Sequence, residues 1–221
     1  MLYMSSLLLV HSLLWYVLLY NMIMYIDNGE RQLMKLAIVL ITALLSSLAY
    51  AESAENLQEA RSSAALLGKS LQTELVGAMQ SGGPLAAISF CNTRAMPISQ
   101  EISAQTGWQV ERTSLLVRNP QNTADAWERQ QLKQFEERLA AGEPVSQLEV
   151  LDVQQQGSQK TERYMKAIAI GEPCLACHGE QISAELSEQL YRLYPEDKAR
   201  GYTLGQLRGA FTLQRTTSVA K

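Results

Sequence analysis

The sequence predicts an α+β domain in which helices flank a small antiparallel sheet. Apolar residues recur at helical spacing over residues 54–80, whereas residues 148–154 and 162–170 form a strand pair around Gly157. The length of 221 residues fits one domain behind a targeting segment. A formal net charge of −3 gives no indication of a nucleic-acid partner.

Two helices are predicted at the start of the domain. Residues 54–80 place their apolar side chains on one helical face. The segment Ser81-Gly82-Gly83-Pro84 ends this helix, and Pro84 lies in the first turn of a second helix that carries Cys91. We expect the second helix to bend or restart near Pro97, because proline removes a backbone donor.

Strands and helices alternate in the rest of the chain. Residues 108–117 predict a strand and residues 118–122 a turn. Thr123 can cap the next helix, which Gly142 and Pro144 close. The remaining predicted elements are the strand pair at 148–154 and 162–170, an amphipathic helix at 183–194 stopped by Pro195, and a last strand at 209–214.

One five-residue motif, Cys174-Leu175-Ala176-Cys177-His178, indicates the chemistry. Cys-x-x-Cys-His is the pattern for covalent attachment of a c-type haem. The two thiols add to the vinyl groups of the porphyrin, and the histidine supplies an imidazole nitrogen to the iron. The motif therefore predicts one covalent haem c, attached through Cys174 and Cys177, with His178 as an axial ligand.

Other uses of a Cys-x-x-Cys pair are a thioredoxin-like redox site, half of a zinc site, or a local disulfide. Zinc needs about four ligands, and outside the motif the chain adds only Cys91 and His11 as cysteine or histidine. A thioredoxin-like pair belongs to a βαβ pattern. Residues 165–170 are a plausible strand, but no second βα unit follows them. Haem attachment explains the complete motif best.

The N-terminus carries an export signal. Met34-Lys35 precedes an apolar run at 36–48, and Ala49-Tyr50-Ala51 follows it, which predicts a signal peptide at residues 34–51. The haem domain would then occupy residues 52–221. We expect an exported, periplasmic protein.

A second apolar run precedes Met34, within an extension at residues 1–33. Three interpretations are open. Met34 is the true start, or residues 1–26 form a transmembrane helix, or the whole segment is an uncleaved anchor. Membrane anchoring through residues 1–48 follows from the last two, and all three place the domain outside the cytoplasm.

The second axial ligand of the iron has several candidates in the sequence. His178 is the only histidine after the signal, so two histidines from this chain cannot bind the iron. Cys91 has no disulfide partner, because the porphyrin uses the other two cysteines. It is either a buried, inert thiol or a thiolate ligand. The candidates are Cys91, Met79, Met96 and Met165.

Several motifs together resemble one known family in order and spacing. They are Phe90-Cys91, Arg112-Thr113-Ser114, Arg118-Asn119-Pro120-x-Asn122, Trp127-Glu128, Cys174-Leu175-x-Cys177-His178-Gly179, Tyr194-Pro195-x-Asp197-x-Ala199-x-Gly201-Tyr202 and Arg208-Gly209-Ala210. The family is the single-haem c-type cytochrome family of the cyanobacterial Tll-like type, a former domain of unknown function. The resemblance covers about Leu57 to Leu213.

This resemblance implies a PAS-like fold and a haem with His178 on one face and Cys91 on the other. The chain departs from the family pattern at Ala124 and Ala167, where proline is usual, and at Gln206, where an acidic residue is usual. These departures concern loops and not the haem.

Three arginines, Arg112, Arg118 and Arg208, are candidates for the haem propionates, because guanidinium groups pair well with carboxylates. Each has an alternative role in an ordinary ion pair. We expect at least one of them to contact a propionate. Asp197, in contrast, is expected to be a turn residue.

Two functions follow from these expectations. The first is a redox or gas sensor module that acts through a separate signalling or redox protein. The alternative is a small periplasmic electron-transfer cytochrome. A haem enzyme is less well supported, since no second histidine after the signal can serve as a distal acid or base.

Overall fold

The computed structural model describes residue 20 and residues 28–218. The chain divides into two compact units, Met1–Glu55 and Asn56–Lys221. Most of the hydrophobic extension predicted at residues 1–33, including nearly all of the proposed transmembrane run, lies outside the described residues. In the part of the chain that is described, no helix is both long and apolar enough to cross a bilayer.

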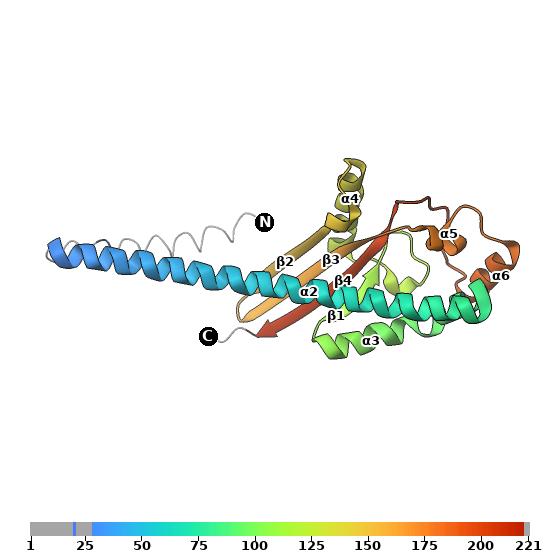
Figure 1. Ribbon diagram of the computed structural model, residues 1–221, viewed down its shortest axis with the longest axis horizontal. Helices are drawn as coiled ribbons and strands as arrows, with labels where there is room; N and C mark the ends of the chain where they lie inside the picture. The colour runs from blue at the N-terminus through green and yellow to red at the C-terminus, as the bar shows by residue number, and fades with distance from the viewer. Residues whose placement is uncertain (1–19, 21–27, 219–221) are drawn as a thin grey trace. The chain divides into compact units, whose positions relative to one another are not determined.

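The predicted α+β class is confirmed in the second unit, which contains one antiparallel sheet of four strands (Figure 1). The strand order is β1-β4-β3-β2, so the last strand pairs with both the first and the third. The strands are β1 (Gln109–Thr113), β2 (Glu149–Gln156), β3 (Gln159–Ala169) and β4 (Leu207–Ser218). β2 and β3 form the predicted hairpin around Gly157.

Apolar clusters cover both faces of this sheet. Tyr164 of β3 packs with side chains of α2 (Asn28–Thr93) and α3 (Ala95–Thr106). Its neighbour Met165 points to the opposite face and packs with side chains of α4 (Ala126–Ala140). Successive residues of a strand alternate between faces, so the neighbours Tyr164 and Met165 contribute to the clusters on opposite faces of the sheet.

The helices begin near the predicted positions, with one small correction. Non-helical dihedral angles at Gly82 and Gly83 interrupt α2, and helix resumes at Pro84 as expected. The next break falls at Arg94, so α3 already begins at Ala95 and accommodates Pro97 in its first turn. Figure 1 shows the chain reversing direction after this break, which lays α3 beside α2.

The predicted cap at Thr123 is wrong, because Asp125 caps α4. The carboxylate of Asp125 accepts a hydrogen bond from the Glu128 backbone N–H at 2.8 Å, and Glu128 accepts from the Asp125 N–H at 3.0 Å. Such a reciprocal capping box satisfies two backbone donors, whereas one threonine would satisfy one. The Thr123 hydroxyl instead donates to the Pro120 carbonyl.

Strand lengths also differ from the prediction at 108–117 and 209–214. β1 stops at Thr113, because Ser114 donates to the carbonyl of Arg208 at 2.8 Å and the chain leaves the sheet. β4 extends to Ser218 because it pairs with β3 along most of its length. The helix α6 (Ala184–Leu193) agrees with the prediction, and Ser183 is its N-cap.

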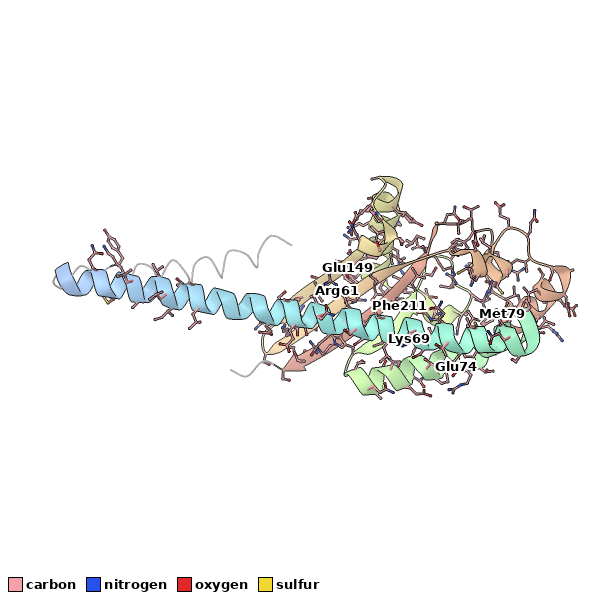
Figure 2. The ribbon with its side chains drawn as sticks, in the orientation of Figure 1. Arg61, Lys69, Glu74, Met79, Glu149 and Phe211 are labelled. Carbon is pink, nitrogen blue, oxygen red and sulfur yellow. The ribbon has the colours of Figure 1, made fainter. Side chains whose placement is uncertain are left out.

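One carboxylate, Glu149, joins the edge strand β2 to α2. It accepts hydrogen bonds from Arg61 Nε at 3.1 Å and from the buried Tyr164 hydroxyl at 2.7 Å (Figure 2). The Arg61 hydrogen bond, with help from Tyr164 and Lys166, lowers the pKa of Glu149 to about 2 against the effect of burial. Glu149 is therefore ionised in the folded protein at neutral pH.

Replacing Glu149 with glutamine should lower the free energy of unfolding by about 1 kcal/mol at pH 7, since the ion pair is partly exposed. The pKa of Glu149 is lower in the folded than in the unfolded chain. The advantage of the wild type should therefore be complete above pH ~5 and decline as the pH falls toward 2. Chemical denaturation across this range measures it. An equal loss in the exposed control Glu137→Gln would contradict the assignment.

Candidate functional site

The seven site residues predicted from the sequence line a single cavity of about 300 Å³. This volume lies at the lower end of the range for ligand pockets. The cavity lies in the second unit, between the later part of α2, the ends of β1 and β4, and α5 (Glu172–His178). The residues are Cys91, Arg112, Arg118, Cys174, Cys177, His178 and Arg208. That they bind a cofactor stays a prediction.

The helix α5 places the motif at the cavity wall. It begins after Gly171, with a proline in its first turn, and ends at His178. The residue after the motif, Gly179, approaches the previous turn closely, and its N–H donates to the Leu175 carbonyl at 2.9 Å. A Cβ atom at this position would lie 2.5 Å from that same carbonyl oxygen. Glycine is therefore required directly after the histidine.

His178 has a defined orientation and a defined tautomer. Its Nδ1 lies 2.7 Å from the carbonyl oxygen of Ala199. A carbonyl only accepts, so Nδ1 carries the proton and Nε2 keeps its lone pair, as an iron ligand requires. Burial, followed by the charges of Arg118 and Arg208, lowers the pKa of His178 to about 3. The ring is thus neutral at physiological pH.

Cys91 approaches the cavity from a different element, the part of α2 after Pro84. Burial raises the pKa of the Cys91 thiol, while the nearby charges of Arg112 and Arg118 oppose that rise. The side chain lies at a cavity wall and not inside one of the packed apolar clusters. This position leaves the ligand interpretation open and weakens that of an inert core thiol.

The three candidate methionine ligands lie in two different places. Met79 and Met96 line the cavity with Cys91. Met165 does not: it is fully buried on the other face of the sheet, packed with Leu132 and Phe135. Met165 is therefore a core residue and is removed from the ligand candidates.

The three arginines also differ in their partners. Arg118 Nε lies 3.2 Å from the carboxylate of Asp197, and its NH2 group donates to the Cys177 carbonyl at 2.5 Å. Arg208 donates to the Ser114 hydroxyl at 2.9 Å and stacks over the Tyr202 ring at 5.6 Å. Among the described residues, neither Arg112 nor Arg208 forms an ion pair with a carboxylate.

Burial lowers the pKa of both Arg112 and Arg208. Two half-buried guanidinium groups without carboxylate partners from the described chain make the cavity suited to an anionic ligand, since a cation withdrawn from water is costly unless it is paired. Arg118, in contrast, forms an ion pair with Asp197, which is the alternative role that the sequence allowed for each of the three arginines.

Three residues at the site, Asp197, Leu75 and Tyr194, have positions that the sequence did not predict. Asp197 is a turn residue as predicted, since its carboxylate accepts from the Ala199 N–H at 2.9 Å. It is also the buried partner of Arg118, which lies far away in sequence. Leu75 and Tyr194 line the cavity as well, although helical periodicity gave them no separate role.

The zinc interpretation finds no ligand set in the described part of the chain. Cys91, Cys174 and Cys177 are free thiols. Residue 20 and residues 28–218 contain no group of three or more histidine, cysteine or acidic side chains positioned to hold a metal ion directly. The thiols and His178 instead lie around a cavity.

Comparison with known proteins identifies the family. The model of the Tll0287-like family matches residues 27–215. The chain therefore belongs to the Tll0287-like family, and the resemblance seen in the sequence motifs is confirmed.

Among solved structures, the chain is similar to that of the cyanobacterial haem protein Tll0287. The two share 24% sequence identity with a TM-score of 0.48, over 70% of this chain and 93% of the other. A comparison with curated proteins gave no match.

The close approach at Gly179 gives a test of the local structure. Gly179→Ala should lower the free energy of unfolding by about 1–3 kcal/mol, because the new Cβ would displace the Leu175 carbonyl. The matched control is Gly77→Ala on α2, where an added Cβ meets open space. That change should instead stabilise the protein by about 0.5–1 kcal/mol. Thermal or chemical denaturation measures both, and equal effects would refute this account of Gly179.

Proposed function

We propose that this chain is an exported haem protein that carries one haem c. Cys174 and Cys177 would attach the porphyrin, and His178 and Cys91 would be the axial ligands. The observation that carries the proposal is that these four side chains, from α5 and α2, line the same cavity. Family membership agrees with it, because the protein for which the family is named is a haem protein.

The residues of the cavity suit each part of this cofactor. His178 presents an unprotonated Nε2 because its Nδ1 proton is held by the Ala199 carbonyl. Cys91 offers a soft sulfur donor; burial raises the pKa of its thiol, and the positive charge of Arg112 opposes that rise. Arg112 and Arg208 supply guanidinium groups for the two propionates. When bound, the haem supplies a one-electron redox couple.

We further propose that the protein is a redox or gas sensor that acts through a separate signalling or redox partner. The proposal includes the PAS-like fold implied by the motifs, with which a four-stranded antiparallel sheet covered by helices agrees. It also includes export through residues 34–51. The alternative is a small periplasmic electron carrier. Ligands on both sides of the iron favour that alternative, because electron transfer needs no open coordination site.

The covalent bond is tested by mass. The exported wild-type protein should keep its haem through acid-acetone extraction, and its denatured mass should exceed that of the polypeptide by one haem. The same mass locates the start of the mature chain, which we expect at or near Glu52. Replacing Cys174 and Cys177 with alanine should abolish attachment, whereas Cys91→Ser should not affect it. Clean extraction of haem from the wild type would refute the proposal.

The role of Cys91 is tested by the reduction potential. A thiolate stabilises ferric iron, so Cys91→Ser should raise the midpoint potential and replace the low-spin thiolate spectrum. Matched controls are Met79→Leu and Met96→Leu, which alter the same cavity without removing the thiol. If a methionine variant changes the spectrum and Cys91→Ser does not, the ligand is that methionine.

Sensing and electron transfer differ in their response to small ligands. A sensor should show a spectral shift when carbon monoxide or nitric oxide is added to the reduced protein at moderate concentration. The shift is expected because a cysteine ligand can take up a proton and leave the iron on reduction. An electron carrier should instead exchange electrons rapidly with a soluble cytochrome and show no shift with either gas. Stopped-flow spectroscopy of the same sample measures both responses.

A further inference from the structure

Arg118 and His178 share one hydrogen-bond acceptor. The carbonyl oxygen of Ala199 accepts from His178 Nδ1 at 2.7 Å and from the NH2 group of Arg118 at 3.2 Å. The same NH2 group donates to the carbonyl of Cys177, the residue before the histidine. Arg118 therefore contacts the histidine's own acceptor and the backbone that carries the histidine.

A buried carboxylate holds this guanidinium in place. Asp197 has a side chain that is only 1% exposed, and its Oδ1 lies 3.2 Å from Arg118 Nε. Asp197 also accepts from the Ala199 N–H at 2.9 Å and from Arg200 Nε at 2.9 Å. The carbonyl and the N–H of Ala199 are thus both engaged by the Arg118–Asp197 pair.

The shared acceptor has an electronic consequence. A carbonyl oxygen that already accepts from a cation is a weaker acceptor for a second donor, so the His178 Nδ1–H bond is less polarised. Strong hydrogen bonding at Nδ1 makes an imidazole a more basic metal ligand, so Arg118 makes His178 a weaker electron donor. The positive charge of Arg118 acts in the same direction, because it disfavours the more positive ferric state.

We propose that Arg118 is a positioning residue that sets the reduction potential of the bound haem through the Ala199 carbonyl, with Asp197 moderating its effect. This inference rests on the proposed function, since it requires haem on His178. It assigns Arg118 to the histidine side of the site and leaves Arg112 and Arg208 for the propionates.

The test compares three variants of the full-length, haem-loaded protein. Arg118→Gln should retain one covalent haem and show a lower midpoint potential than the wild type. Arg118→Lys keeps the charge but lacks the planar fork that contacts the two carbonyls through its NH2 group and the Asp197 carboxylate through Nε. Its potential should lie between those of Arg118→Gln and the wild type. Asp197→Asn removes the negative charge that partly neutralises Arg118. The midpoint potential of this variant should therefore be higher than that of the wild type.

Each result bears on the proposal. If Arg118→Lys matches the wild type, charge alone sets the potential and the positioning role is overturned. An unchanged potential in Arg118→Gln also overturns it. If Arg118→Gln does not fold, Asp197→Asn decides, and a potential that fails to rise refutes the proposal. The haem content of each variant is measured by its alkaline pyridine spectrum. Absence of covalent haem from the wild type would refute the proposed function instead.

Discussion

The hydrogen bond between His178 Nδ1 and the carbonyl of Ala199 is the contact on which the geometry of the site depends. It fixes the tautomer of the only described histidine, because a carbonyl cannot donate. It also ties the end of α5 to the segment that contains Asp197 and Ala199. Backbone bonds extend the same junction: Tyr202 N–H donates to the His178 carbonyl at 3.0 Å, and Gly201 N–H donates to that of Gly179 at 3.1 Å. Rotation of the His178 ring away from the cavity would break its hydrogen bond to the Ala199 carbonyl.

The fold brings the second half of the site to this histidine. The break at Gly82 and Gly83 separates the long first part of α2 from the short second part, which carries Cys91 to the cavity. Gly83 adopts a φ of 66°, which glycine reaches without strain. Because β1 and β4 are neighbours, Arg112 and Arg208 meet at the same cavity although they lie far apart in sequence. The sheet topology thus assembles a site whose chemistry is encoded in separate segments.

Local patterns predicted the parts of the molecule that depend on local interactions. The helical period of residues 54–80, the hairpin around Gly157 and the amphipathic helix predicted at 183–194 each rest on residues near in sequence, and each appears in the structure. The motif at Cys174–His178 is visible in the sequence because Cys-x-x-Cys-His is a pattern of fixed spacing. For the same reason, family membership could be recognised from motifs alone.

Apart from the cap of α4, the predictions that failed concern residues whose partners lie far away in sequence. Thr123 and Asp125 are both good capping residues, and the reciprocal bond to Glu128 selected Asp125. Met165 looked equivalent to Met79 and Met96 until the sheet placed it on the opposite face. The separate roles of Arg112, Arg118 and Arg208 depend on Asp197 and on strand pairing, which composition does not reveal.

X-ray absorption at the iron edge of the oxidised protein tests the central claim most directly. If His178 and Cys91 hold the haem, the iron should show one histidine nitrogen and one cysteine thiolate sulfur among its ligands besides the porphyrin nitrogens. The short iron–sulfur contribution should disappear in Cys91→Ser and persist in Met79→Leu. An iron environment without sulfur in the wild type, or with a sulfur that survives in Cys91→Ser, would contradict the proposal that His178 and Cys91 hold the haem from opposite sides.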